Sequence, residues 1–232
     1  MLGKGIFKLE KFELGGINIY IFPWNVIDSK TYMIIDGENA ILFDAVYCSE
    51  MDAFMKKNRI KNVNVFLTHE HFDHIYGIPY LKENYKCRIY SNDSCAEAVK
   101  NPSKNLSNKA DIFLMFHPDN TLLKDVKAIS ASVDCVLEDG QIVSCCGHSI
   151  ETVILPGHSS GSTCYVMDGK YLFSGDTLLG IPTVTRFPTG SKKLFLEKTI
   201  PFLKSKAGEI EMVFPGHGEP GNISDMIKCN EV

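Results

Sequence analysis

The most constraining feature of this sequence is a short run of histidines and carboxylates, Thr68-His69-Glu70-His71-Phe72-Asp73-His74. It directly follows residues 63–67, a short apolar and partly β-branched segment that predicts a strand. A spacing of two places the side chains of His69 and His71 on the same side of extended backbone. It is not the spacing of four that puts two ligands on one helical face. The run therefore predicts a cluster of polar side chains at the end of a strand.

The residue types in this run are those of a metal site. Imidazole nitrogens and carboxylate oxygens suit zinc, iron or manganese, and no sulfur donor is needed. Gathered without a metal, these groups would repel one another on protonation and would bury polar atoms at a cost. We therefore expect four metal ligands in the run: His69, His71, Asp73 and His74. Glu70 and Phe72 are interpreted as surrounding residues, and Glu70 is not assigned as a base.

Three further candidate ligands stand in turn sequences that follow predicted strands. They are His158 after the strand expected at 150–155, Asp176 after the strand at 171–173 and His217 after the strand at 211–214. Each of them alone is more typical of a structural or exposed residue than of a metal ligand. Because all three follow the carboxyl ends of strands, we expect them to converge on one rim of a sheet. His117 and His148 lack such a setting and are predicted to be surface histidines.

The order of the predicted elements favours a layered α/β protein. The first 45 residues are expected to form strands, with Asp36-Gly37-Glu38-Asn39 as a hairpin turn. Helices are expected at 49–58, 75–84, 94–100 and 192–204, and further strands lie between them. This order predicts two helix-flanked sheets in a single domain, residues 1–232. The irregular segment 92–130 is the best candidate for a substrate-facing excursion or lid.

Composition narrows the class of partner. The chain has 232 residues, 44% of them hydrophobic, and a net charge of −4. The acidic balance argues against a nucleic-acid surface and fits a small-molecule site. The sequence contains no run of 18 consecutive apolar residues, so it predicts no membrane span. Charged residues interrupt the N-terminus, where a signal peptide would be apolar. The eight cysteines form no C-x-x-C pair, so reduced thiols and a cytoplasmic location are expected.

Together, His69-x-His71-x-Asp73-His74 and the later His158, Asp176 and His217 resemble the metal-binding motifs of the metallo-β-lactamase-fold superfamily. The segments 156–162, 174–178 and 215–218, and Leu137-Glu138-Asp139-Gly140 upstream, are similar to the glyoxalase II (hydroxyacylglutathione hydrolase) branch. The resemblance runs from about residue 16 to residue 220. It implies a four-layer αββα sandwich, of the α/β (α+β) class, with metals at one edge of the two sheets.

The resemblance also implies how two divalent metal ions are held, with zinc expected and iron or manganese as alternatives. One ion would take His69, His71 and His158, the second would take Asp73, His74 and His217, and Asp176 would bridge both. Asp73 is then the expected catalytic partner for the proton of the nucleophile, a hydroxide between the metals. The implied function is a dinuclear-metal hydrolase that acts on a thioester or ester of a small molecule.

The sequence departs from glyoxalase II in two places that concern the substrate. The full enzyme has a C-terminal helical domain that grips glutathione, and here only residues 218–232 follow the last ligand. Single-domain relatives often carry a Gly-Arg-x-Asp stretch, where this chain has Thr185-Arg186-Phe187-Pro188. Arg186 is a candidate for binding a substrate carboxylate. A plain surface arginine is an equal alternative.

Other functions stay open at this point. A persulfide dioxygenase relative would hold one iron through two histidines and an aspartate, and a lactonase would open a cyclic ester. A non-catalytic metal-binding or sensor protein is the alternative outside enzymes. A β-lactamase proper is disfavoured by the expected lack of a signal peptide, and a nuclease is disfavoured by the net charge.

Overall fold

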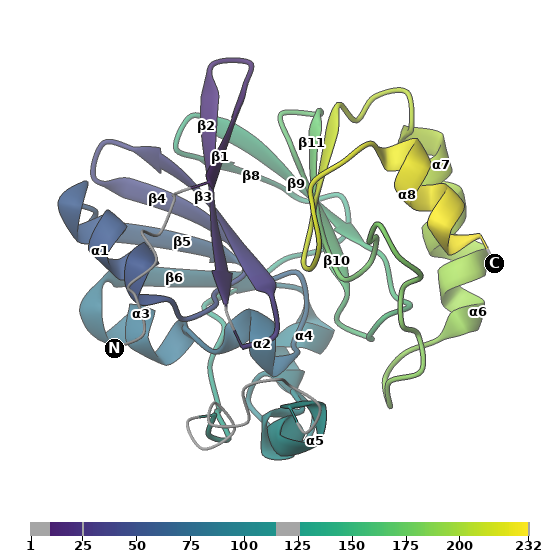
Figure 1. Cartoon of the computed structure of the whole chain (residues 1–232), viewed down its shortest axis with the longest axis horizontal. Helices are drawn as coiled ribbons and strands as arrows, with labels where there is room; N and C mark the ends of the chain where they lie inside the picture. Colours follow the sequence, from purple (N-terminus) through teal and green to yellow (C-terminus); the bar gives the residue numbers. More distant parts are fainter. Residues whose placement is uncertain (1–9, 25, 115–125, 232) are drawn as a thin grey trace, which may run out of the picture.

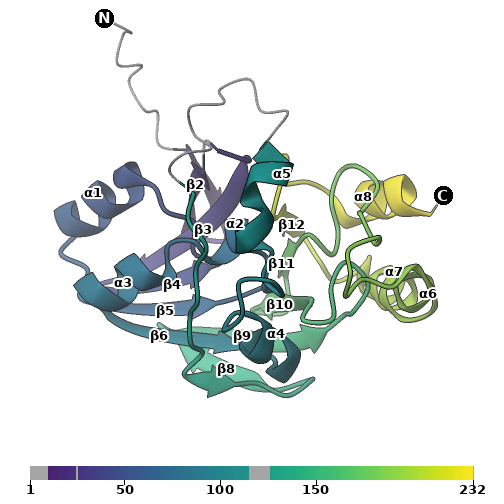
Figure 2. The ribbon, with the colours of Figure 1, turned by 90° about the horizontal axis from the view of Figure 1, so that it is seen from below.

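The computed structural model describes residues 10–24, 26–114 and 126–231, so the prediction for His117 falls outside the described residues. Two sheets pack face to face, and helices cover both outer faces (Figures 1 and 2). In Figure 1, α1 and α3 lie outside the first sheet, and α6, α7 and α8 lie outside the second. This arrangement confirms the predicted αββα sandwich.

The first sheet contains most of the N-terminal half. Within the described residues its spatial order is β1 (Glu10–Leu14), β2 (Ile17–Trp24), β3 (Ser29–Asp36), β4 (Asn39–Phe43), β5 (Asn62–Phe66), β6 (Lys86–Ser91) and β7 (Cys135–Val136). The expected hairpin joins β3 to β4, where Asp36 pairs with Asn39. From β4 to β7 the strands are parallel, so they end at the same edge.

The second sheet has the order β12 (Met212–Pro215), β11 (Tyr171–Gly175), β10 (Thr163–Met167), β9 (His148–Ile154) and β8 (Ile142–Cys145). Aromatic rings fill the space between the sheets. Phe43 of the first sheet stacks on Phe173 of the second with ring centres 3.6 Å apart, and Phe173 stacks on Phe214 at 4.9 Å. These side chains are fully buried, so their apolar surface stabilises the pairing of the sheets.

The helices are short. They are α1 (Ser49–Lys57), α2 (Phe72–Ile75), α3 (Ile78–Asn84), α4 (Asp93–Ala98), η1 (Ser107–Lys109), α5 (Ala110–Leu114), α6 (Lys192–Leu194), η3 (Phe195–Thr199), α7 (Ile200–Lys206) and α8 (Ile223–Asn230). The helix expected at 192–204 is interrupted by the π-helical turn η3. Pro201 explains this interruption, because proline has no N–H for the α-helical ladder. Across the described ranges, no helix has the length and apolar character needed to cross a bilayer.

Candidate metal centre

The structure brings all seven predicted ligands together at one edge of the two sheets. Their donor atoms form three overlapping groups, each with atoms within 4.8 Å of one another: His69, His71 and His158; His69, His74 and Asp176; Asp73, His74 and His217. The first and third groups are the two ligand sets that the sequence resemblance implies. The grouping therefore agrees with two adjacent metal positions.

Strand ends create this convergence. β5 leads into the histidine run, whose second part forms the short helix α2. Asp176 follows β11, and His217 follows β12. The two sheets are tied at this edge because the Tyr165 hydroxyl donates to the Leu67 carbonyl at 2.9 Å. The edge is thus fixed from both sheets.

Asp176 lies between the two ligand groups. Its Oδ1 atom is 3.4 Å from Nε2 of His74, and its Oδ2 atom is 3.6 Å from Nε2 of His158. Oδ2 is also 3.5 Å from Nε2 of His217. One carboxylate therefore reaches both groups, which is the position that a bridging ligand needs.

Buried polar atoms without partners show that the residues fit metal ions. Nε2 of His69, Nε2 of His74 and Oδ1 of Asp176 have no hydrogen-bond partner among the described residues. Leaving such atoms buried and unpaired is costly, and a cation would satisfy all three. A side chain at Gly216 would collide with the Asp176 carboxylate and the His74 ring, so glycine keeps this space open.

Hydrogen bonds at the far side of the ring orient three of the five imidazoles. Nδ1 of His158 donates to the Val184 carbonyl at 2.8 Å, and Nδ1 of His74 donates to Asp44 at 2.8 Å. Nδ1 of His69 lies 3.1 Å from the Thr68 hydroxyl. Each contact fixes the tautomer that leaves Nε2 free for a metal.

Asp44 is a functional residue that the sequence reasoning missed. Its carboxylate accepts from the Thr68 N–H at 2.7 Å, from the Thr68 hydroxyl at 2.8 Å and from His74. The residue is buried and adopts a left-handed φ of 62°, which tight local contacts must hold in place. The available signal was an acid directly after the apolar strand β4.

The sequence reasoning also missed Ser29 and Lys30 of β3, which contact the segments that carry the candidate ligands. The Ser29 hydroxyl donates to the Asp73 carbonyl at 2.8 Å. The Lys30 N–H donates to the Gly216 carbonyl at 2.9 Å, and the buried Lys30 ammonium contacts the Gly218 carbonyl and Glu219. The strand therefore fixes both the histidine run and the loop that carries His217.

Glu70 supports the site without belonging to a ligand group. Its carboxylate is fully buried and accepts from the Ser159 hydroxyl at 2.9 Å and from the Thr189 hydroxyl at 3.3 Å. Burial raises the pKa of this carboxyl. Glu70 thus links the histidine run to the loop of His158 and to the segment that follows Phe187.

The charges of the cluster suit cation binding. Burial lowers the pKa of His71 to about 3, and the neighbouring His158 adds to this effect. Burial alone would raise the pKa of Asp73, but His74 and His217 lower it to about 2. Burial would likewise lower the pKa of His217, yet Asp176 and Asp73 raise it to about 9. Buried negative charge therefore attracts protons in the metal-free protein, and metal ions would replace them.

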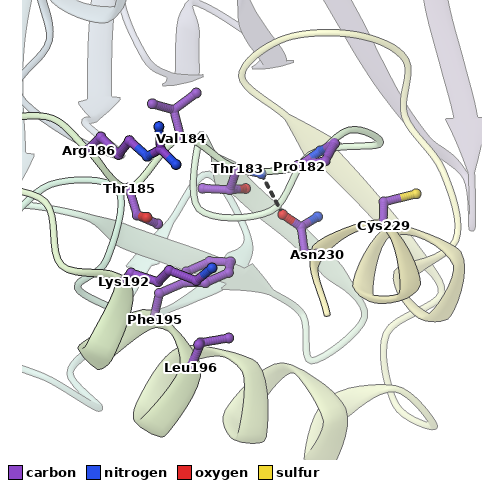
Figure 3. Close-up of a pocket in the computed structure, with 10 residues that line it drawn as sticks. All are labelled: Pro182, Thr183, Val184, Thr185, Arg186, Lys192, Phe195, Leu196, Cys229 and Asn230. Carbon is purple, nitrogen blue, oxygen red and sulfur yellow. Dashed lines mark hydrogen bonds between the residues drawn. The ribbon is translucent and has the colours of Figure 1, made fainter. Parts of the chain in front are cut away.

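A pocket of about 130 Å3 opens over the cluster, and its floor is formed by His71, Asp73, Asp176 and His217. Arg186 is not among its lining residues. Instead, Arg186 lines a second pocket of about 390 Å3 beside α6 and α8, together with Lys192 and Phe195 (Figure 3). Val184 connects the second pocket to the ligand cluster, because it lines that pocket and its carbonyl accepts from His158. Substrate binding by Arg186 stays a prediction.

Two other regions singled out in the sequence have clear positions. His148 lies away from the cluster and pairs with Asp168 at 2.7 Å, partly buried rather than on the open surface. The segment 92–130, expected to face substrate, contributes Leu106 and Phe113 to the pocket over the cluster.

The fold and the site together define the class of protein. Residues 24–217 match the model of the Metallo-beta-lactamase superfamily, and the chain belongs to this family. Its members are metallo-hydrolases, and the cluster of histidines and aspartates fits a metal site.

Two curated bacterial relatives are similar over different lengths. The "Probable polyketide biosynthesis zinc-dependent hydrolase BaeB" of Bacillus velezensis is 25% identical over 229 residues, which cover 95% of this chain and 87% of that protein. The "Hydroxyacylglutathione hydrolase" of Francisella philomiragia is 26% identical over 155 residues. That match covers 66% of this chain and 49% of the relative, so the chain matches only about half of the longer protein.

Among solved structures, TTHA1623 in a di-iron-bound form superposes with a TM-score of 0.72 at 21% identity. The match covers 91% of this chain and 98% of that chain. At this identity the likeness shows the fold.

Proposed function

We propose that this protein is a dinuclear-metal hydrolase of the glyoxalase II type, which hydrolyses a thioester or ester of a small molecule. The observation that carries the proposal is the pair of three-residue donor groups joined through Asp176. The similarity to a hydroxyacylglutathione hydrolase supports a thioester substrate, since in a hydroxyacylglutathione the acyl group is bonded to the sulfur of glutathione.

The donor set suggests two divalent ions. His69, His71 and His158 would hold one ion, Asp73, His74 and His217 would hold the other, and Asp176 would contact both. Nitrogen and oxygen donors suit zinc, and iron or manganese would also fit. When bound, the ions would lower the pKa of water and polarise the substrate carbonyl.

Asp73 is proposed to handle the proton of the attacking water. Its carboxylate lines the floor of the pocket, where Oδ2 lies 3.4 Å from Nε2 of His74 and 3.2 Å from Nε2 of His217. An ionised carboxylate there can orient the water and accept its proton. The water oxygen bonds to the acyl carbon, the carbon–sulfur or carbon–oxygen bond breaks, and the thiol or alcohol leaves with a proton.

The test combines metal analysis with a substrate panel. Purified protein is assayed with S-lactoylglutathione, simple thioesters, esters and lactones, and its metal content is measured in the same preparation. About two ions per chain with acyl transfer to water would support the proposal. Bound metal with no hydrolysis of any acyl ester would contradict it. Oxygen consumption with glutathione persulfide, at about one iron per chain, would indicate the dioxygenase alternative instead.

A further inference from the structure

The pocket over the ligand cluster has a polar floor and an apolar wall. The wall, here called the apolar collar, is formed by five side chains from four separate segments: Ile27, Phe72, Leu106, Phe113 and Phe187. None of the described residues that line this pocket is a lysine or an arginine. The collar therefore offers apolar contact and no positive charge from the protein.

Phe187 joins the collar directly to the floor. Its ring centre lies 4.7 Å from that of His71 and 5.1 Å from that of His158. On its other side, Phe187 lies 6.0 Å from Phe113, which in turn lies 6.0 Å from Phe72. The three rings thus form a row that reaches the histidines at the floor.

Two residues of the collar have arrangements that packing alone does not require. Phe113 lines the pocket and is 42% exposed, so part of its ring is open to a ligand. Leu106 is buried with a left-handed φ of 65°, a conformation that a leucine rarely adopts. Unusual backbone of this kind concentrates at ligand sites.

We propose that the apolar collar binds the acyl group of the substrate and selects apolar acyl groups over charged or hydroxylated ones. Phe187 and Phe113 are the specificity-determining residues. This inference rests on the proposed function, because it names the substrate class of the same site.

The size of the pocket limits the acyl group. An apolar cavity of about 150 Å3 accommodates one benzene molecule. The pocket here is about 130 Å3, and its floor is formed by residues of the ligand cluster, so the space beside the collar suits a short aliphatic chain or a single ring. A hydroxyl or carboxylate on the acyl group would lose water without finding a donor in the collar.

The experiment measures kcat/KM of the metal-loaded protein for thioesters of one thiol that differ only in the acyl group: acetyl, butyryl, hexanoyl, benzoyl, lactoyl and succinyl. We expect kcat/KM to rise about fourfold for each added methylene until the pocket is full. Benzoyl should exceed lactoyl by at least about tenfold. Phe113→Ala should reduce the ratio of hexanoyl to acetyl by about fivefold with unchanged metal content. Phe187→Leu should reduce the benzoyl preference.

Leu196→Ala is the matched control, because Leu196 is an exposed apolar residue of the second pocket. It should leave all ratios unchanged. If Leu196→Ala changes the acyl preference and Phe113→Ala does not, the acyl group binds in the second pocket and the inference is wrong. Hydrolysis with equal or higher kcat/KM for lactoyl or succinyl also overturns it. Absence of all hydrolysis contradicts the proposed function itself, so the two failures are distinguishable.

Discussion

The floor and the collar of the pocket differ in how the chain specifies them. The floor belongs to a cluster of histidines and aspartates at strand ends, in which the rings of His69, His74 and His158 are each held by a hydrogen bond at Nδ1. The collar comes from separate segments and is held by ring packing, with Phe113 partly in solvent. The floor should allow little change, whereas Ile27 and Phe113, which have no ring contact with the histidines among the described residues, should vary without disturbing it.

This difference separates reaction from selectivity. The donor atoms of the floor determine what chemistry the site supports, since metal binding depends on their type and number. In the proposed function, the collar determines which acyl group gains binding energy next to that chemistry. Substitutions in the two regions should therefore have distinct effects on metal content and substrate preference.

The largest effect is expected from loss of a floor ligand. His71→Ala and Asp176→Ala should each reduce activity more than about a thousandfold and lower metal occupancy at one or both positions, because a donor atom is lost. Metal analysis and steady-state kinetics measure this. If either variant retains full activity, the ligand assignment is wrong. Asp168→Asn is the control, because Asp168 also pairs with a histidine but lies outside the cluster.

Asp44→Asn tests whether a residue behind the floor matters. Asn keeps the shape of Asp44 but removes the charge that orients His74 and accepts from Thr68. Loss of such a supporting carboxylate should weaken metal affinity about 10- to 100-fold. Competition with a metal chelator measures it. If a folded Asp44→Asn protein binds metal with wild-type affinity, the charge of Asp44 is not needed for metal binding.

Metal affinity should depend on pH. In the metal-free protein Asp176 and Asp73 raise the pKa of His217 to about 9 against the effect of burial, so metal must displace a proton below that pH. Affinity should fall about tenfold per pH unit for each proton displaced as the pH drops below 9. The same raised pKa stabilises the metal-free protein below pH 6.5, and this stabilisation is lost as the pH rises through 9. Calorimetry in two buffers of different ionisation enthalpy measures the protons released, and a pH-independent affinity contradicts the prediction.

Glu70→Ala should destabilise the fold by roughly 2 kcal/mol, because the hydroxyls of Ser159 and Thr189 lose a buried acceptor. Glu70→Gln keeps the shape and one acceptor, so it should cost less. Denaturant unfolding of the metal-free variants measures the difference. Equal stability of the Ala and Gln variants would show that the carboxylate contacts are not important to the fold.

The smallest effect is expected in the collar. Ile27→Ala should change kcat/KM for apolar substrates by about fourfold and leave metal content at the wild-type value. A change in metal content would mean that floor and collar are not separable.

The sequence predicts the floor better than the collar for a physical reason. Metal ligands need particular donor types, so His69-x-His71-x-Asp73-His74 is informative as a local pattern. Ile27, Leu106 and Phe113 carry no such signal, because any apolar residue at these positions is equally consistent with core packing. Their meeting over one site depends on tertiary structure.

The fold shows the same contrast. Alternating and β-branched runs predicted the hairpin of β3 and β4 and the strand before the histidine run. Short edge elements such as β7 and β8, and the terminal helix α8, were not predicted. Their stability comes from neighbours rather than from local pattern, as in β7, which pairs with β6 through only two residues.

The most direct test of the central claim is the activity of one preparation before chelation, after chelation and after metal is restored. The account predicts about two divalent ions per chain in the active protein, loss of thioester hydrolysis when they are removed, and recovery when zinc, iron or manganese is returned. Undiminished hydrolysis by protein that retains less than about 0.1 ion per chain would contradict it.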